Sequence, residues 1–433
     1  MSTNEPLHVI VAGGGIGGLA LANGLRRAGV SVSVHEREVR RTDRLQGFRI
    51  HIDPNGSRAL AEMLSPELYS LFTACAGRGG NGFGVVTEQM KQLLRFEPDD
   101  SADDPAGGGH FGISRITLRQ LLLADLEGIV HYGSMFERYE ELADGRIAAY
   151  FADGTFEVGD VLVGADGGTS RVRAQRLPQA QRVETGIVTI AGKYALTPES
   201  RARLDPRLLR NPLSVIPPTG CGMFLAPHEF DIPAQAAGVV GNEAGLAPGV
   251  LFDNTQPYVF WAFAAKRERY GAELEQLSAP ELHALATRMT AGWDPALRTL
   301  VAESTSDTAT LIPIRTSVPT PAWEPSPVTL LGDAIHAMTP FGGIGANTAL
   351  RDAQLLCRNL IGADRRAHGL LDGIAAYESR MRDYGFDAVR TSLTAANQAV
   401  SDSRVARTAG KLFFRTADAI PSMKRRMFSA TSS

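Results

Sequence analysis

A glycine-rich turn lies near the start of the chain, between a short apolar run and a segment with helical periodicity. Its residues, Gly13 to Gly18, match the pattern G-x-G-x-x-G. In this pattern Gly13 permits a tight turn, Gly15 lets a pyrophosphate approach the backbone, and Gly18 lets the helix pack on the strand. The helix that begins near Ile16 and Gly17 would point its free N–H groups at the phosphates. The spacing therefore predicts a dinucleotide site.

Glu36 ends the next predicted strand, 18 residues after Gly18. A carboxylate at this place accepts hydrogen bonds from a ribose and repels a 2′-phosphate. We therefore expect the site to hold FAD or NAD and not NADP. The alternative interpretation of the turn is a purely structural one, in which the glycines only allow a strand to meet a helix.

Two more predicted strands end in an aspartate that is followed by a turn. Asp166 follows an apolar run that starts at Val161, and Ser170 is placed to cap the helix after it. Asp333 follows a second run, which starts at Val328. The turn leaves the Asp333 carboxylate able to bind a polyol chain.

The segment after Asp333 is rich in proline and glycine and leads into a helix predicted from about Ala346 to Leu360. A helix start carries free N–H groups and a positive partial charge. Those near Gly345 and Asn347 would face a ligand that gains negative charge during a reaction.

The composition sets limits on the kind of protein. The chain has 433 residues, 44% of them hydrophobic and 21% charged, which is typical of a globular protein with a large core. Its net charge of −3 favours no polyanionic partner, so we expect no nucleic acid. The three cysteines form no Cys/His cluster, and we expect no metal site. The N-terminus lacks the features of a secretory signal, and no apolar run reaches about 18 residues, so we expect a cytoplasmic protein without a membrane partner.

The order of the predicted elements gives an α/β fold. Residues 7–34 predict a strand, a helix and a parallel strand. Residues 182–315 change to strands separated by proline and glycine, which indicates a second domain. The first pattern restarts near residue 328, so we expect the first domain to be discontinuous in sequence.

The three motif segments, in this order and spacing, resemble the class A flavoprotein monooxygenases of the para-hydroxybenzoate hydroxylase type, and closely the small tetracycline-inactivating members. The resemblance covers most of residues 7–400 and implies a Rossmann-like FAD-binding domain, an inserted sheet-based substrate domain and a C-terminal helical region. The expected FAD-binding segments are 1–75, 113–181 and 316–400, the expected substrate-domain segments are 76–112 and 182–315, and the helical tail is 401–433.

The resemblance also implies roles for single residues. Glu36 looks like the acidic residue that binds the adenosine ribose, and Arg37 lies where the family often contacts adenine. Arg115 matches the arginine of the family's Arg-x-x-Leu helix, which touches FAD. Asp166 looks like the residue linked to both FAD and the pyridine nucleotide, and Asp333 like the residue that binds the ribityl chain.

The glycine-rich loop resembles the one beside the isoalloxazine ring in this family. Reduced flavin carries negative charge at N1 and O2, and a helix start there favours reduction by about 1–2 kcal/mol. We therefore expect cofactor contacts from Gly345, Ala346 and Asn347. The loop residues expected beside the substrate are Pro340, Phe341 and Gly342.

The activity that the resemblance implies is FAD-dependent oxygenation. NADH or NADPH reduces FAD, O2 forms a flavin C4a-hydroperoxide, and this oxygenates an electron-rich, largely apolar aromatic, polyketide or indole-type molecule, as in natural-product tailoring. Only one dinucleotide fingerprint is present, so the nicotinamide is expected to bind transiently and its type stays open. The partners are then a small molecule and O2, and the protein is a monomer or a homodimer.

Candidates for the chemistry and for the substrate pocket are few. Arg49 and His51 share one face of a predicted strand that the resemblance runs past the flavin, and His51 either transfers a proton or has a structural role. Phe224 and Phe263 could line an aromatic pocket, with core packing as the alternative. His336 is expected to stabilise its loop.

Four other functions share these motifs in part. A flavin-dependent reductase needs the same FAD site, and so does a halogenase, although the halogenase segment Trp-x-Trp-x-Ile-Pro is absent from the sequence. A non-enzymatic flavin-binding protein is the third. A simple NAD-dependent dehydrogenase would leave the segment from Asp333 to Asn347 without a role.

Overall fold

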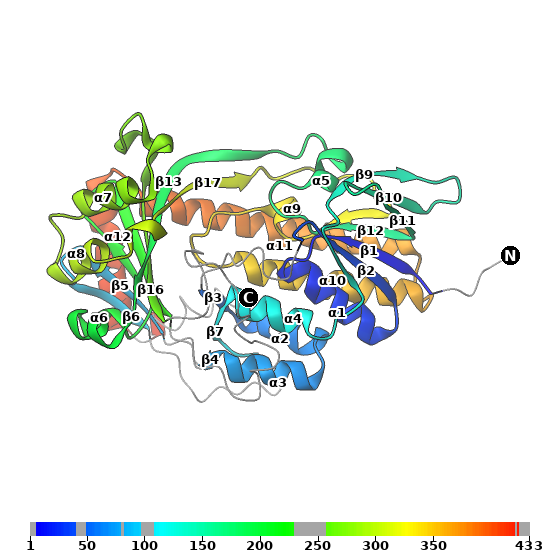
Figure 1. The fold of residues 1–433 in the computed structure, drawn as a ribbon, viewed down its shortest axis with the longest axis horizontal. Helices are drawn as coiled ribbons and strands as arrows, with labels where there is room; N and C mark the ends of the chain where they lie inside the picture. Colours follow the sequence, from blue (N-terminus) through cyan, green and yellow to red (C-terminus); the bar gives the residue numbers. More distant parts are fainter. Residues whose placement is uncertain are drawn as a thin grey trace.

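The computed structural model describes residues 6–39, 49–78, 82–96, 108–228, 257–420 and 422–423. Two halves lie side by side (Figure 1). One is built on a parallel sheet with helices packed against it, and the other is built on a large, mainly antiparallel sheet. The long helix α11, Leu370–Ala399, runs from the first half to the second.

The parallel sheet has five strands in the order β18-β12-β1-β2-β8. Each neighbouring pair is parallel. Parallel strands buried on both faces are rich in branched apolar residues, and here Val9, Ile10 and Val11 are fully buried. The bounds are β1 His8–Ala12, β2 Ser31–Glu36, β8 Val130–Tyr132, β12 Val161–Gly164 and β18 Val328–Leu330.

The order of these strands brings the predicted motifs together. The glycine turn follows β1, Asp166 follows β12, and Asp333 follows β18, so all three lie at the carboxyl edge of one sheet. This edge is where open α/β sheets bind ligands. The predicted strand, helix and parallel strand over residues 7–34 and the Rossmann-like arrangement are confirmed.

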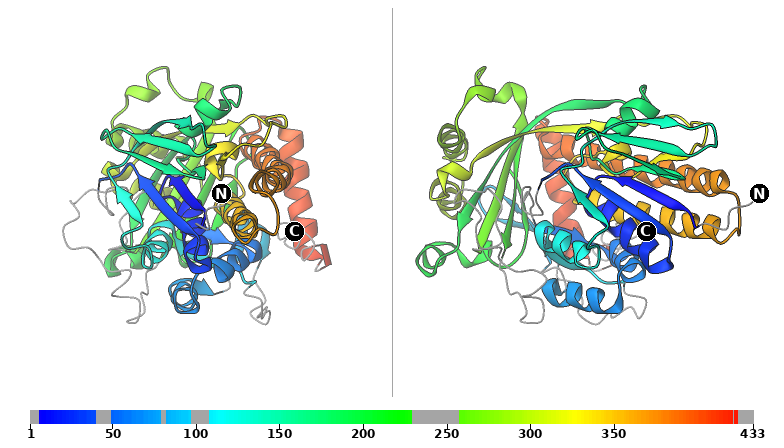
Figure 2. Two further views of the ribbon diagram at one scale, coloured as in Figure 1. Left: turned by 90° about the vertical axis from the view of Figure 1, so that its right-hand side faces the viewer. Right: turned by 45° about the vertical axis from the view of Figure 1, so that its right-hand side comes forward.

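Helices cover one face of the parallel sheet and a small antiparallel sheet covers the other (Figures 1 and 2). Helix α1 ends at Gly29, whose φ of 82° is the left-handed conformation that glycine adopts at low cost. The bounds on the helical side are α1 Ile16–Ala28, α2 Pro54–Met63, α3 Pro66–Cys75, α4 Arg115–Leu123 and α10 Gly345–Asp364. The small sheet consists of β9 Phe136–Glu141, β10 Ile147–Phe151 and β11 Phe156–Gly159.

Glu157 joins the small sheet to the parallel sheet. One of its oxygens lies 2.7 Å from His8 Nε2 and the other lies 2.5 Å from His35 Nε2. Burial opposes the charged form, but hydrogen bonds from both histidines outweigh it and hold the pKa of Glu157 far below its usual value. A lowered carboxyl pKa stabilises the fold above the carboxyl's unfolded pKa.

We expect Glu157→Gln to lower the free energy of unfolding at neutral pH. The difference from wild type should shrink as the pH falls below about 4.5, the usual glutamate pKa. Urea unfolding at pH 5 and at pH 3.5 measures this. A difference that is larger at pH 3.5 than at pH 5 would contradict the assignment.

The large sheet has seven strands in the order β17-β13-β16-β15-β14-β5-β6. It therefore joins the strands of residues 83–96 to those of residues 182–317. The bounds are β5 Phe83–Thr87, β6 Gln92–Phe96, β13 Arg182–Ala195, β14 Leu213–Ile216, β15 Cys221–His228, β16 Tyr258–Lys266 and β17 Thr310–Ser317.

The two faces of the large sheet have different coverings. One face packs its apolar side chains, among them Trp261 and Phe263, against helical segments. The other face meets the end of α11, the loop residue Phe341 and helix α12. The helices are α6 Pro198–Arg203, α7 Ala279–Met289 and α8 Pro295–Ala302 on the first face and α12 Arg404–Ala419 on the second.

A third sheet, β3-β7-β4, lies beside α3, α4 and the start of α10. Its strands are β3 Arg49–Ile52, β4 Gly77–Arg78 and β7 Phe111–Ser114. Two short helices complete the description, α5 Arg171–Arg176 and α9 Asp333–His336. Ser170 caps α5 as predicted, because its hydroxyl accepts a hydrogen bond from Arg173 N.

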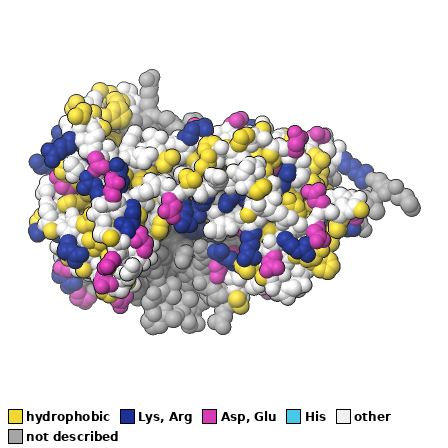
Figure 3. Space-filling model, turned by 90° about the horizontal axis from the view of Figure 1, so that it is seen from above, with side chains coloured by type: hydrophobic (Ala, Val, Ile, Leu, Met, Phe, Trp, Pro, Cys, Tyr) yellow, Lys and Arg dark blue, Asp and Glu magenta, His cyan; other side chains and the backbone are white. Residues whose placement is uncertain are grey.

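Charges are mixed on the surface. Figure 3 shows positive and negative side chains interspersed with apolar ones on the face seen from above. Within the ranges that the structure describes, no helix has both the length and the hydropathy needed to cross a membrane.

Candidate active site

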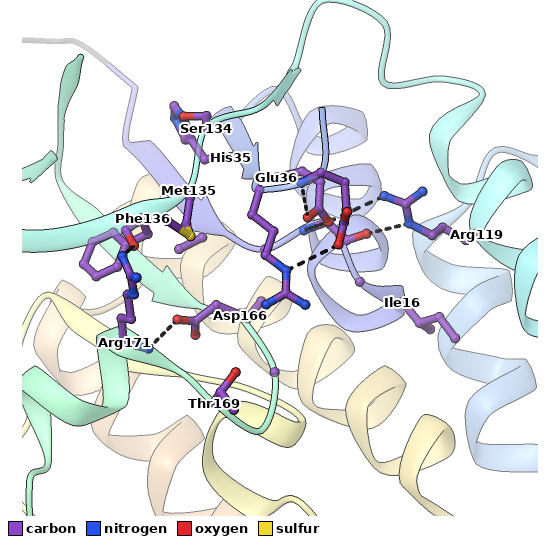
Figure 4. Close-up of a pocket in the computed structure, with 18 of the residues that line it drawn as sticks. Ile16, His35, Glu36, Arg119, Ser134, Met135, Phe136, Asp166, Thr169 and Arg171 are labelled. Atoms are coloured by element: carbon purple, nitrogen blue, oxygen red, sulfur yellow. Dashed lines mark hydrogen bonds and ion pairs between the residues drawn. The ribbon is translucent and has the colours of Figure 1, made fainter. Parts of the chain in front are cut away.

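A cavity of about 400 Å³ opens at the carboxyl edge of the parallel sheet. Figure 4 shows Glu36 and Arg119 on one side of it and Asp166 and Arg171 on the other. The glycine turn forms part of the wall. The predicted residues that line the cavity are Gly13, Gly15, Ile16, Glu36, Arg37, Arg115 and Asp166.

The glycine turn has the geometry that a dinucleotide site needs. Gly13 has a φ of +116°, and a Cβ there would lie 2.3 Å from Ala165 O, so only glycine fits. A Cβ on Gly18 would lie 2.2 Å from Gly13 O and 3.2 Å from Val11 Cγ1, so the helix can approach the strand and its turn this closely only with glycine at this position. A Cβ on Gly15 would meet no protein atom within 4 Å. The space beside Gly15 is therefore left open toward the cavity.

Glu36 is buried at the end of β2 and is tied to the glycine turn. Its Oε2 accepts a hydrogen bond from Gly14 N at 3.1 Å, and its Oε1 accepts one from Glu38 N at 3.1 Å. Arg119 of α4 contacts the same Oε2 at 3.5 Å and donates to Gly14 O at 3.0 Å. The carboxylate thus keeps a fixed orientation at the cavity wall, with lone pairs left for further donors.

Arg119 is a residue that sequence reasoning did not select. Arg115 lines the cavity and is exposed, whereas Arg119, one turn later on the same helix, binds both Glu36 and the turn. The signal that could have found it is the helical spacing of four residues, which places both arginines on one face of α4. Arg37 is also exposed at the wall, with its Nε 3.4 Å from Glu38.

Asp166 lines the cavity, and its two oxygens have different surroundings. Oδ2 accepts hydrogen bonds from Arg171 N at 2.7 Å and Val172 N at 3.4 Å, at the start of α5. Oδ1 is shielded from solvent and has no hydrogen-bond partner within the described residues. Burial raises the pKa of Asp166, although Ser170 and the α5 N–H groups oppose the shift. Such an orphaned acceptor fits a ligand that brings a donor.

The second group of predicted cofactor residues lies around the turn between β18 and α9. Asp333 is exposed as the first residue of α9. A Cβ on Gly17 would lie 2.7 Å from Leu331 Cδ1 and 3.4 Å from Ala349, so the first turns of α1 and α10 meet at the end of β18. None of Asp333, Gly345, Ala346 and Asn347 lines the 400 Å³ cavity.

Helix α10 begins without a capping side chain among the described residues. The N–H groups of its first turn therefore remain available, as the prediction for Gly345, Ala346 and Asn347 requires. The Asn347 side chain is held in place, because its Oδ1 accepts from Asp53 N at 3.0 Å and its Nδ2 donates to His51 O at 2.9 Å. Each of these two atoms can make one further hydrogen bond, and the backbone N–H is a third group that can serve a cofactor.

His51 is brought close to a histidine that the sequence did not suggest. Its Nε2 lies 3.1 Å from His110 Nδ1, and the two rings stack with centroids 5.2 Å apart. Burial lowers the pKa of His110, against the influence of Asp53. Asp53 follows the last residue of β3 and caps α2 by accepting from Asn55 N and Gly56 N. The Arg49 side chain lies outside the described residues.

The loop residues expected beside the substrate lie near the junction of the two halves. Pro340 is exposed, and Phe341 packs on the large sheet beside Ala264 and Ala396. Gly342 has a φ of +91°, which favours glycine. The loop therefore connects the start of α10 with the face of the large sheet that meets α11.

The predicted aromatic pair requires a correction. Phe263 is 0% exposed and packs in the core beneath the helices, with its ring 5.8 Å from Trp293. Phe224 pairs in register with Ala262 and so lies on the opposite face of the sheet. The two side chains cannot line one pocket. Phe260, which also lies opposite Phe263, is the aromatic residue of β16 that shares the face of Phe224.

The residues present fit FAD. The open space at Gly15, the uncapped start of α1 and the fixed Glu36 carboxylate suit the pyrophosphate and the adenosine ribose. The orphaned Asp166 Oδ1 suits a hydroxyl or N–H donor. Within the described ranges, no group of His, Cys, Asp and Glu could hold a metal ion.

Comparisons with known proteins agree with this chemistry. The model of the FAD binding domain family matches residues 261–392. A crystal structure of a putative FAD-containing monooxygenase from Photorhabdus luminescens is 34% identical, with a TM-score of 0.79, and the match covers 91% of this chain and 98% of that one. The fold also matches HpxO of Klebsiella pneumoniae complexed with FAD and uric acid, at 22% identity over 99% of this chain and 97% of that one, with a TM-score of 0.75.

Two curated relatives carry activities in their names. The 3-amino-4-hydroxybenzoate 2-monooxygenase PtmB3 of Streptomyces platensis is 30% identical over 84% of this chain and 81% of its own length. The dual O-methyltransferase/FAD-dependent monooxygenase elcB of Phaeosphaeria nodorum is 29% identical over 90% of this chain, which spans only 46% of that relative. Taken with the site geometry, these similarities show that the chain belongs to the family of FAD-dependent monooxygenases.

Proposed function

We propose that this protein uses FAD to insert one oxygen atom of O2 into an electron-rich, largely apolar aromatic molecule, with NADH or NADPH as the reductant. The observation that carries the proposal is the cavity at the carboxyl edge of the parallel sheet. Glu36 and Asp166 line this cavity together with Gly15, beside which the space is open. When bound, FAD supplies the redox chemistry, and the protein supplies binding, orientation and electrostatics.

In this proposal the adenosine part of FAD lies in the cavity. The N–H groups at the start of α1 hold the pyrophosphate, Glu36 accepts from the ribose, and Arg119 keeps Glu36 in place. Arg37 and Arg115 contribute exposed positive charge at the cavity wall. Asp166 accepts through its orphaned Oδ1.

The flavin part is assigned to the neighbouring segments. Asp333 would bind the ribityl chain, and the N–H groups in the first turn of α10 would stabilise the negative charge that the flavin gains on reduction. The loop from Pro340 to Gly342 excludes water beside the ring. His51, with Arg49 on the same strand, is the candidate for moving a proton, and His110 lies within hydrogen-bond distance of it.

The substrate lies, in this proposal, against the face of the large sheet that carries Phe224 and Phe260. That face meets Phe341 of the glycine-rich loop and α11, whereas the face of Phe263 is closed by helices. The name of the Streptomyces platensis relative, an aminohydroxybenzoate monooxygenase, supports an aromatic substrate. The fungal relatives whose names include an O-methyltransferase are about twice as long, so their combined activity is not carried over.

The protein is proposed to be cytoplasmic, as a monomer or a homodimer, with the domain division predicted from the sequence. The three cysteines support the location, since all are free thiols in the structure. The sheet membership of residues 83–96 and 182–317 supports the division.

The test is a spectrum of the purified protein followed by anaerobic reduction. We expect a flavin spectrum, bleaching by NADH or NADPH, and faster bleaching with at least one member of a panel of phenols, indoles and polyketides. Admitting O2 should then yield an oxygenated product detected by mass spectrometry. A protein that takes up no added FAD would contradict the cofactor assignment, and reduction without any oxygenated product would favour a reductase.

A further inference from the structure

A buried cluster of polar side chains lies behind the turn that carries Asp333. Its centre is Asp352, in the middle of α10 and 0% exposed. Asp352 Oδ2 accepts a hydrogen bond from Gly332 N at 2.7 Å and lies 2.6 Å from His336 Nε2. Its Oδ1 accepts from Tyr384 OH of α11 at 2.6 Å. One carboxylate thus joins the turn before α9, the end of α9, and α11.

The contacts of Asp352 place it between the two segments proposed to hold the flavin part of FAD. Gly332 directly precedes Asp333 in the chain, so the hydrogen bond to Gly332 N restrains the backbone that presents the Asp333 carboxylate. Asp352 itself belongs to the helix whose first turn contains Gly345 to Asn347. The hydrogen bond therefore sets the position of the turn relative to the start of α10.

Two glycines, one in the turn and one on α11, are required by this arrangement. Gly332 has a φ of +61°, a conformation that side chains rarely adopt. A Cβ on Gly385 would lie 2.7 Å from His336 Cδ2, so glycine is needed to make room for the ring. Burying a carboxylate is costly unless it is fully hydrogen-bonded, and here three donors surround it. His336 stabilises its loop, as expected from the sequence, and it does so through Asp352.

His336 and Asp352 form a buried pair, with Nε2 and Oδ2 2.6 Å apart. Burial disfavours the charged imidazole, but the Asp352 carboxylate outweighs this and raises the pKa of His336. His336 Nδ1 is buried without a partner among the described residues. The contact that reaches the proposed cofactor segments is the hydrogen bond from Gly332 N, so we expect the pair to act on a ligand through the position of the backbone.

We propose that Asp352, held by His336 and Tyr384, is a positioning residue for FAD that sets the distance between the Asp333 turn and the start of α10. It contacts no reacting atom, and it acts through Gly332 and α10. The inference rests on the proposed function, because it concerns how this chain holds FAD.

The test compares Asp352→Asn with a matched control, Glu378→Gln. Glu378 is also a buried carboxylate, and its Oε1 accepts from Thr329 Oγ1 of β18 at 2.8 Å, but it does not contact the turn. Three quantities are measured for each purified protein: the Kd for FAD by fluorescence titration of the apoprotein, the midpoint potential of the bound flavin, and the free energy of unfolding without FAD.

We expect Asp352→Asn to raise the Kd for FAD by about tenfold and to make the midpoint potential more negative, because the start of α10 no longer meets the ring correctly. Glu378→Gln should keep the wild-type Kd and potential, because Glu378 does not contact the turn. The inference is overturned if Asp352→Asn matches wild type in both quantities, or if the two variants change them equally.

A milder variant covers the case in which Asp352→Asn does not fold. Tyr384→Phe removes only the hydrogen bond to Oδ1 and leaves a ring of nearly the same shape. It should weaken FAD binding by about two- to fivefold and shift the potential in the same direction. Wild-type values for this variant would also overturn the inference. Failure of the wild-type protein itself to bind FAD would instead contradict the proposed function.

Discussion

Replacing Gly15 by valine is expected to abolish FAD binding while the fold remains intact. The Gly15 backbone has a φ of −80° and a ψ of −179°, which valine adopts readily. No protein atom lies within 4 Å of the position that its Cβ would take. The new side chain would instead fill the space beside the start of α1 that the pyrophosphate needs, so we expect the Kd for FAD to rise by at least about 100-fold.

The measurement is an FAD titration of the apoprotein, with circular dichroism and urea unfolding to monitor the fold. Gly271→Val is the matched control, because Gly271 also has no protein atom within 4 Å of an added Cβ and lies far along the chain from the cavity residues. It should bind FAD as the wild type does. Tight binding by Gly15→Val would mean that the cofactor does not approach the glycine turn.

Replacing Glu36 by alanine is expected to reduce both FAD affinity and stability. The substitution removes the acceptor of Gly14 N and the partner of Arg119. A buried N–H left without an acceptor costs about 1–3 kcal/mol, which should appear in urea unfolding of the apoprotein. Loss of the ribose acceptor adds to this in the complex, so the Kd for FAD should rise by about 10- to 100-fold.

Glu36→Gln separates the two effects. Glutamine keeps a carbonyl oxygen that can accept from Gly14 N, but its NH2 group cannot accept from Glu38 N, so we expect part of the stability to return. It provides one acceptor in place of two, and its affinity for FAD should lie between those of wild type and Glu36→Ala. If Glu36→Ala lost stability but bound FAD normally, the carboxylate would be a support for the glycine turn alone.

The buried position of Phe263 could not be predicted from the alternation of side chains along its strand. Alternation along β16 correctly separates Phe260 from Phe263, because successive side chains of a strand point to opposite faces. It does not say which face a helix covers. That depends on the packing of α7 and α8 against the sheet, and it places Phe263 in the core.

The cofactor motifs were accessible to sequence reasoning because each depends on a local constraint. Gly13 and Gly18 are required by close backbone contacts within one strand, turn and helix, and Ser170 caps the next residues of its own chain. The order of the three motifs then predicts their meeting, because parallel strands end at one edge of the sheet.

Contacts between distant segments were not accessible in the same way. Arg119 reaches Gly14 across 105 residues, Asn347 binds the backbone at Asp53 and His51, and Asp352 is joined by groups from three elements. Such pairings depend on how whole helices pack. Helical spacing places Arg119 on the same face of α4 as Arg115, but it does not identify the distant group that Arg119 binds.

The sequence by itself therefore determined the Rossmann-like unit, the dinucleotide chemistry of its glycine turn and the placement of Asp166 and Asp333 at strand ends. Only the tertiary structure decided which oxygen of Asp166 stays free, which face of the large sheet meets the FAD-binding half, and which buried carboxylate holds the Asp333 turn. The physical reason is that local backbone and capping constraints act within a few residues, whereas burial and the pairing of polar groups are settled by packing between elements far apart in the chain.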